Sequence, residues 1–279
     1  MASRSTRQRF MRNPTAIVGL AMVTILFAIA VVGPLVAPYD PRTGSLIDQL
    51  QPASWAHPLG TDEQGRDVLS RMLYGARNSL AIGIGAVAMA VVVGCVVGAL
   101  AGAAGGLIDA ALMRITDGLL AIPGIVLAIG MVALLGQGFF AVMVAVALTN
   151  APAFARLLRS SLVALGPAEY ITAARTAGLS STRIFFRHML PNALAPLLVS
   201  VTLALATAII TVAGLGFVGL GPADPGTPEW GVMLTEAGKF LRTDPLLLFY
   251  PALAIALTAF AFNLVGDGLR EAMDPKVGD

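Results

Sequence analysis

The sequence predicts an all-α membrane protein, a polytopic bundle of six transmembrane helices. Its composition supports this fold class, because 57% of the 279 residues are hydrophobic, 12% are charged and the mean hydropathy is +0.81. These values exclude an ordinary soluble globular domain. Charged side chains are absent from five stretches, and each is longer than the roughly 20 residues with which a helix crosses a hydrocarbon core. The stretches are 13–39, 78–108, 118–155, 188–223 and 245–266.

Each charge-free stretch predicts one span, except the third, which predicts two. Gly136 and Gly138 flank Gln137 in the third stretch, and such a glycine pair favours a break between helices. Pro191 and Pro196 interrupt the beginning of the fourth stretch, so a single span remains there. The predicted spans are 17–36, 80–104, 118–135, 139–154, 194–218 and 246–266.

The distribution of Lys and Arg predicts that both termini lie in the cytoplasm. With six crossings, 12 of the 18 Lys and Arg residues fall in segments on the side of the N-terminus, which are 1–16, 105–117, 155–193 and 267–279. Positive residues accumulate on the cytoplasmic side of a membrane. We therefore expect a multi-pass protein of the cytoplasmic membrane, in contact with the lipid bilayer.

The predicted organisation is a cytoplasmic tail (1–16), a first span (17–36), an external segment (37–79), a core of five helices (80–266) and a second cytoplasmic tail (267–279). The arginines before the first span are also typical of a secretory signal peptide. However, an apolar stretch of about 20 residues exceeds the usual 7–15 of a signal peptide. The first span is therefore expected to remain in the protein.

No Asp, Glu, Lys or Arg lies within a predicted span, and His57 and His188 lie outside all of them. Ion-coupled carriers and intramembrane proteases need ionisable groups or metal ligands at membrane depth. The sequence therefore argues against both classes, and we expect no catalytic residues, metal or cofactor. The formal net charge of +2 also argues against nucleic-acid binding, and the lone Cys95 excludes disulfides and thiolate zinc sites.

Small residues recur at packing intervals in the second span. Gly94, Gly98 and Gly102 are spaced four apart, and such spacing lets a second helix approach closely. The pattern fits either an interface between subunits or ordinary packing within one bundle.

The two external segments contain candidate docking or gating residues. From Asp67 onward, apolar residues recur every three to four positions, which predicts an amphipathic helix lying at the membrane surface as an elbow. Asp62 and Arg66 precede it and are candidates for contact with a partner or substrate. Trp230 in the second segment fits an anchor at the headgroup level or a gate lining.

The most informative cytoplasmic segment is 166–191, between the fourth and fifth spans. Pro167 and Glu169 predict the start of a short helix, and Gly178 can adopt the left-handed conformation that ends it. A second helix is expected from Ser180, Ser181 or Thr182 to Pro191. Ala173 and Ala174 would give the first helix a smooth side for a partner's groove, with Arg175 and Arg183 offering polar contacts.

This segment resembles the "EAA" loop of binding-protein-dependent ABC importer permeases. Glu169, Ala173, Ala174 and Gly178 match its first half, and His188 to Pro191 match the second. The external sequence "HPLGTDEQGRDVLSRMLYGARNSL" and the later "GLGFVGLGPADPGTPEWG" are similar to the second permease subunit of dipeptide, oligopeptide and nickel importers. The resemblance covers nearly the whole chain.

The resemblance implies the type I ABC importer permease fold and a set of partners. These would be a homologous second permease, two ATPase domains that are separate or fused, and an extracytoplasmic substrate-binding protein. ATP and Mg would be used by the ATPases, in agreement with the absence of a GxxxxGK[ST] phosphate loop in this sequence. Glu169, Ala173, Ala174, Arg175, Gly178 and Arg183 would then contact an ATPase.

Two positions depart from the family pattern. Many relatives have an acidic residue where this chain has Val212, and Ser where it has Gly216. The cargo, whether a dipeptide, a longer peptide, nickel or haem, is not evident from the residues. A secondary carrier acting alone and a purely structural assembly subunit are the competing interpretations.

Overall fold

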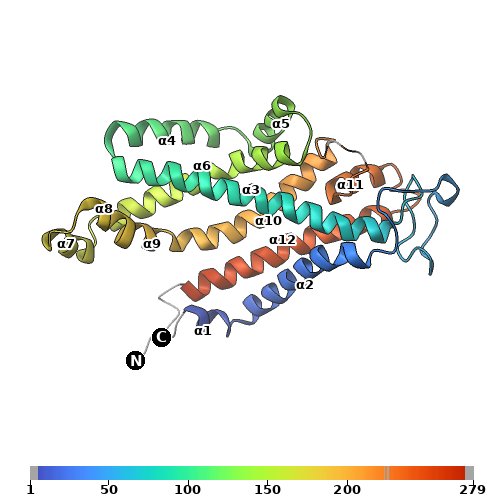
Figure 1. Cartoon of the computed structure of the whole chain (residues 1–279), viewed down its shortest axis with the longest axis horizontal. Helices are drawn as coiled ribbons and strands as arrows, with labels where there is room; N and C mark the ends of the chain where they lie inside the picture. The colour runs from blue at the N-terminus through green and yellow to red at the C-terminus, as the bar shows by residue number, and fades with distance from the viewer. Residues whose placement is uncertain (1–5, 223, 225, 274–279) are drawn as a thin grey trace.

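The computed structural model describes residues 6–222, 224 and 226–273, which form long helices lying side by side along one axis (Figure 1). Within this part of the chain, the β-type pairing is limited to an isolated bridge between Thr61 and Asp67. The helices are α1 Thr6–Phe10, α2 Pro14–Val36, α3 Val68–Ala104, α4 Gly106–Leu120, α5 Gly124–Leu135, α6 Phe139–Leu165, α7 Glu169–Thr176, α8 Ser181–Ile184, α9 Leu190–Ala193, α10 Ala195–Phe217, α11 Trp230–Gly238 and α12 Leu246–Met273. Short 3-10 and π segments cover Leu46–Asp48 and Phe185–Met189.

The all-α polytopic fold is confirmed, and the protein is an integral multi-pass membrane protein. Helices α2, α3, α6, α10 and α12 are long and apolar enough to span a membrane. Helices α4 and α5 pass the same test only as a pair, bent by 95°. Counted as one broken span, this pair gives six candidate spans in the described chain. In Figure 1 the pair lies alongside α3 and α6, between the end of α3 and the beginning of α6.

The third span differs from its expected bounds of 118–135. Helix α4 begins twelve positions earlier, at Gly106, and the chain breaks at Pro123, which precedes α5. Proline disfavours helical conformation in the residue before it and lacks the N–H of a helix interior. Both acidic residues of α4 pair with arginines of α6: Asp109 lies 2.6 Å from Arg159, and Asp117 lies 2.5 Å from Arg156.

The amphipathic helix predicted from Asp67 onward is not a separate elbow at the membrane surface, and that prediction is wrong. Residues 68–79 are the first turns of α3, which runs without interruption for 37 residues. Asp67 is its N-cap and accepts hydrogen bonds from the Ser70 amide and hydroxyl, both at 2.7 Å. At 1.5 Å per residue, such a helix is roughly 55 Å long, against a hydrocarbon core of about 30 Å. The amphipathic beginning of α3 therefore extends beyond the hydrocarbon core, and it packs on α11.

The most extensive helix contact in the described chain is between α3 and α6, and the three spaced glycines lie in it. A Cβ at Gly94 would be 2.6 Å from the carbonyl oxygen of Ala151, and one at Gly98 would be 2.5 Å from that of Ala155. A Cβ at Gly102 would lie 2.9 Å from a Leu162 methyl group. The structure thus places this pattern inside one bundle, where close approach of the backbones allows van der Waals packing.

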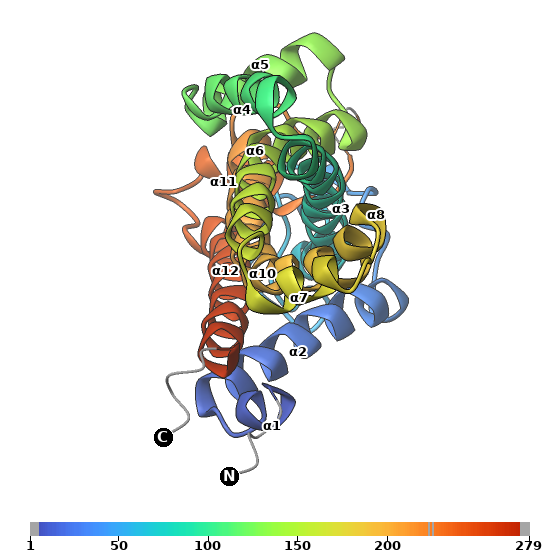
Figure 2. The same cartoon turned by 90° about the vertical axis from the view of Figure 1, so that its left-hand side faces the viewer.

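The two ends of the bundle carry different elements. Helix α1, the end of α12 and the α7–α8 segment lie at one end, and Figure 2 views the bundle from that end. The loop between α2 and α3 and helix α11 lie at the opposite end (Figure 1). This separation agrees with an even number of crossings between α1 and the end of α12.

Candidate functional site

The α7–α8 segment is built around a tight turn that follows from local sequence. Gly178 has a φ of +78°, the left-handed conformation that glycine adopts without steric cost. The Gly178 amide donates to the Arg175 carbonyl at 3.0 Å, and the Leu179 amide donates to the Ala174 carbonyl at 3.2 Å. This pair of bonds is the Schellman arrangement that ends a helix. Ser180 then caps α8 through the Arg183 amide.

The segment has its own small core, which fixes its shape. Ile171, Ala174 and Ile184 are buried against one another, with Leu179 and Met189 packed beside them. Residues on both sides of the Gly178 turn contribute to this cluster. The α7–α8 segment is therefore a folded unit, inserted between α6 and α10.

Ala173 and Ala174, which were expected to share one smooth side of α7, point in different directions. Ala173 is exposed, whereas Ala174 is 9% exposed and belongs to the small core. Consecutive residues on a helix are rotated by about 100°, so both cannot face the same partner. The expected shared face is wrong for Ala174, and Ala173 alone is presented outward.

The charged residues of this segment are all at its surface. Glu169, Arg175 and Arg183 are exposed, and within the described part of the chain none of them forms an ion pair. Around them the segment presents an outward surface with two unpaired positive charges and the small side chain of Ala173. Such a surface can enter a groove that carries negative charge.

At the opposite end of the bundle, Asp62, Arg66 and Trp230 are buried, contrary to their expected role in docking. Their exposed fractions are 8%, 1% and 2%. Charge and an indole ring in an external loop suggested an accessible surface, but the sequence does not show which partners cover them. The structure assigns all three to contacts that join α11 to the residues just before and at the beginning of α3.

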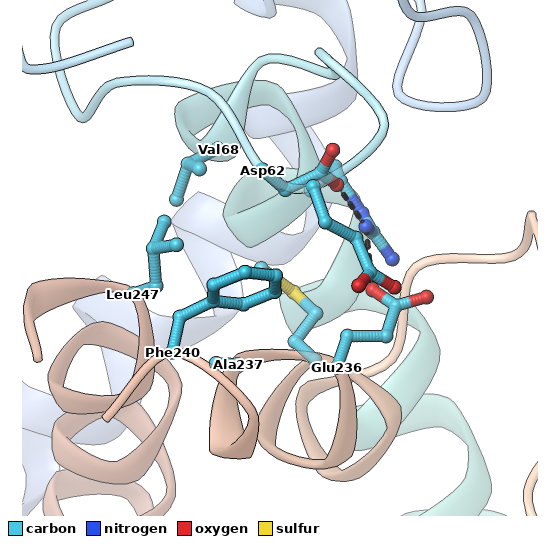
Figure 3. Close-up of a pocket in the computed structure, with 9 residues that line it drawn as sticks. Asp62, Val68, Glu236, Ala237, Phe240 and Leu247 are labelled. Carbon is cyan, nitrogen blue, oxygen red and sulfur yellow. Dashed lines mark hydrogen bonds and ion pairs between the residues drawn. The ribbon is translucent and has the colours of Figure 1, made fainter. Parts of the chain in front are cut away.

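Asp62 and Arg66 belong to a four-residue ion cluster, part of which is drawn in Figure 3. The Nε of Arg66 lies 2.7 Å from Asp62, and its Nη2 lies 2.9 Å from Glu236 on α11. Arg71 donates to Asp62 as well, and lies 2.7 Å from Glu236. Sequence analysis missed Arg71 and Glu236, because 165 residues separate them.

The electrostatics of the cluster fix the charge of Asp62. Burial by itself raises the pKa of this carboxyl, but the positive charges of Arg71 and Arg66, with hydrogen bonds from both, outweigh it and hold the pKa below its ordinary 3.8. Asp62 is thus a carboxylate paired with buried arginines. Such a cluster joins elements firmly, since removing one partner leaves a buried charge uncompensated.

Trp230 starts α11 and packs into a glycine gap on α3. A Cβ at Gly75 would lie 2.8 Å from the indole ring, whose Nε1 donates to the Met72 carbonyl at 3.2 Å. The headgroup anchor expected for Trp230 is therefore wrong: the ring is a wedge between helices. Trp55 is instead the fully exposed tryptophan.

Glu229, also missed by sequence analysis, occupies the place beside Gly216. It is 1% exposed and accepts hydrogen bonds from the Ser79 hydroxyl at 2.8 Å and the Val232 amide at 3.0 Å. A Cβ at Gly216 would lie 2.5 Å from its carboxylate oxygen. Burial raises the pKa of Glu229 above its ordinary value, more strongly than these bonds lower it. Gly216 thus provides space for an acid from another segment, and Val212 is a buried core residue.

We expect the Asp62→Asn substitution to lower the free energy of unfolding by about 3–5 kcal/mol at neutral pH, because in the described chain it leaves two buried arginines sharing one carboxylate, that of Glu236. Since the folded pKa of Asp62 is lowered, its stabilisation is present above pH 3.8 and is lost as the pH falls through the lowered value. Thermal unfolding of the detergent-purified protein at several pH values measures both effects.

The matched control is Glu63→Gln. Glu63 pairs at 3.2 Å with Lys239, whose side chain is 63% exposed, and such pairs contribute about 0–1 kcal/mol. Equal unfolding temperatures for the two variants would contradict the structural role of the cluster.

Comparison with known proteins places the chain among transport permeases. Residues 71–279 match the family described as binding-protein-dependent transport system inner membrane component. Residues 3–53 match the N-terminal TM domain of oligopeptide transport permease C.

Named relatives align over nearly the whole chain. The dipeptide transport system permease protein DppC of Alkalihalophilus pseudofirmus is 42% identical, covering 98% of this chain and 90% of its own length. The glutathione transport system permease protein GsiD of Pectobacterium atrosepticum is 45% identical, with coverages of 97% and 90%. The di/tripeptide transport system permease protein DppC of Pseudomonas aeruginosa is 41% identical, with coverages of 97% and 91%.

A solved structure supports the fold. A chain of the MetNI methionine ABC transporter, in an inward-facing conformation, superposes with a TM-score of 0.61 over 73% of this chain and 97% of its own. At 22% identity, this likeness bears on the fold alone.

Proposed function

Because the chain belongs to the family of binding-protein-dependent transport system inner membrane components, we propose that it is the permease subunit of an ATP-driven importer of dipeptides or short oligopeptides. The observation that carries this proposal is the 41–45% identity, over nearly the whole chain, to permeases named for dipeptide, di/tripeptide and glutathione transport. The protein would lie in the cytoplasmic membrane with both termini inside.

In this proposal the chain is one part of a larger complex. A homologous second permease completes the passage, two cytoplasmic ATPase domains bind ATP and Mg, and an extracytoplasmic binding protein delivers the peptide. The permease itself is non-catalytic. The proposal that the ATPases bind the α7–α8 segment is supported by its position. The segment lies at the same end of the bundle as α1 and the end of α12 (Figure 2), which is the cytoplasmic end in this proposal.

The α7–α8 segment would couple ATP hydrolysis to transport as a lever. Its small core and its Schellman turn make it a compact unit. It follows α6 directly, and helical turns from Ser181 to Ala193 connect it to α10. A displacement of this unit by closing ATPases would therefore be transmitted to both spanning helices and would switch the passage between inward and outward access.

Uptake of a labelled dipeptide tests the proposal. Deletion of this permease is expected to reduce uptake to background in cells that retain the other subunits, and reintroduction should restore it. Because energy comes from ATPases, their loss should have the same effect. Uptake that persists without the ATPases would favour a carrier acting alone, and uptake that survives loss of this chain would favour a structural subunit. Either result contradicts the proposal.

A further inference from the structure

A polar hollow of about 700 Å³ opens at the end of the bundle that carries α11. Its walls come from the segment after α2, from the first turns of α3, from the start of α6 and from the loop before α11. This volume lies within the roughly 300–1,000 Å³ of sites that bind small molecules. The residues that matter below are Tyr39, Asp40, Tyr74, Arg77, Asn78 and Phe139.

Local structure fixes most of this lining. Tyr74, Arg77 and Asn78 are spaced three and four positions apart on α3, so they share one helix face. The Asn78 side chain donates to the Pro228 carbonyl at 2.6 Å, which ties α3 to the loop before α11. The Tyr39 amide donates to the Ser70 hydroxyl at 3.1 Å and holds the segment after α2 against α3.

Arg77 is the unusual member of the hollow. The neighbouring Arg66 and Arg71 are buried in ion pairs, and Arg42 lies 3.8 Å from Asp224. Arg77, by contrast, is exposed and makes no ion pair or side-chain hydrogen bond with the residues that the structure describes. Its guanidinium therefore has all its donors available for an anion in the hollow.

The hollow also presents an available negative charge. Asp40 is exposed and accepts a hydrogen bond from the Arg42 amide at 2.8 Å within its own turn. In the described chain it forms no ion pair. The lining of the hollow thus includes one cation, Arg77, and one anion, Asp40, that form no ion pair with described residues. Tyr39 and Tyr74 line the hollow as well.

We propose that this hollow is a receiving site for the free termini of a short peptide, with its carboxylate on Arg77 and its ammonium group at Asp40. A guanidinium binds a carboxylate through two parallel N–H donors, and tyrosine rings offer apolar surface with a polar tip for a peptide's side chain. The inference rests on the proposed function, and adds to it a place where peptide binds on the external face.

The purified complete complex in lipid nanodiscs, without its binding protein, tests the site. The probe is alanyl-photoleucine, a dipeptide with a light-activated diazirine side chain, and adducts are mapped by mass spectrometry. We expect adducts on residues that line the hollow. The Arg77→Gln variant would lose the ion pair between Arg77 and the peptide carboxylate. A partly exposed pair of this kind contributes about 1 kcal/mol, so the adduct yield at subsaturating peptide should fall about fivefold.

Three controls make the result specific. Arg77→Lys retains the charge and should recover part of the yield. Arg242→Gln removes another exposed external arginine, outside the hollow, and should leave the yield unchanged. The C-amidated form of the probe, applied to the unaltered complex, should react about fivefold less, and this comparison holds even if Arg77→Gln fails to assemble.

Three results would overturn the inference. The first is an adduct pattern that avoids the hollow, and the second is an equal yield for the free and amidated probes. The third is an unchanged yield in Arg77→Gln together with weaker attachment of the binding protein, since Arg77 would then serve docking. ATP-dependent dipeptide uptake, measured in parallel in cells that contain all the subunits, separates the two proposals: uptake without adducts removes only the receiving site, whereas no uptake removes the proposed function.

Discussion

The Gly98→Leu substitution is expected to abolish assembly of a folded permease. A Cβ at this position would lie 2.5 Å from the Ala155 carbonyl oxygen and 3.1 Å from its Cα. These are backbone atoms of α6, so the contact can be relieved only by separating two long helices. Extra side-chain volume in a packed core lowers the free energy of unfolding by about 1–3 kcal/mol, even where neighbouring side chains can move to accommodate it. We expect a larger loss here, because the α3–α6 contact includes the central apolar core.

The yield of monodisperse protein in detergent and its unfolding temperature measure this effect. Gly118→Leu is the matched control: Gly118 is also a helical glycine, on α4, but a Cβ there meets no atom within 4 Å. The control should give near-normal yield. If Gly98→Leu gave the same yield and unfolding temperature as Gly118→Leu, the close α3–α6 packing would be wrong.

The Ala173→Trp substitution is expected to reduce peptide uptake strongly while leaving the permease folded. Ala173 is exposed on α7, so an indole ring at this position has space in the isolated chain. In a tight ATPase groove the same ring would prevent α7 from seating. We expect uptake to fall by at least about tenfold, since a steric cost of about 1.4 kcal/mol or more at the docking step suffices for that factor.

The neighbouring alanine provides an internal comparison. Ala174 is buried with Ile171 and Ile184, so Ala174→Trp should lower the yield of folded permease itself. Ala53→Trp, at an exposed position of the external loop, should change neither yield nor uptake. Uptake, copurification of the ATPases and permease yield distinguish the three variants. Normal uptake with Ala173→Trp would contradict the lever proposed for α7.

Part of the structure of the α7–α8 segment could be predicted from its local sequence, and part could not. The left-handed Gly178 turn follows from glycine's conformational freedom, and Ser180 as a cap follows from its side-chain oxygen. Which of the two alanines is buried depends on where Ile184 packs after the turn. That contact arises only when both sides of the turn have folded together.

The end of the bundle that carries α11 shows more clearly what cannot be predicted from local sequence. Charge and hydropathy indicated an external loop, and suggested that Asp62 and Arg66 were available to partners. In the structure Arg66 pairs with Glu236, 170 residues away. Periodicity and propensity within a window of sequence contain no information about such a pairing, so the cluster of Asp62, Arg66, Arg71 and Glu236 could not be assigned.

By itself, the sequence determined that the chain crosses a membrane as helices and approximately where it does so. Each backbone polar group in hydrocarbon must be satisfied within its own segment, so long charge-free stretches have one solution. The tertiary structure alone decided that α3 continues past its apolar part, that charged α4 packs on α6, and which external charges are buried. These outcomes depend on charge pairing and packing between distant segments, and those energies exist only once the segments are in contact.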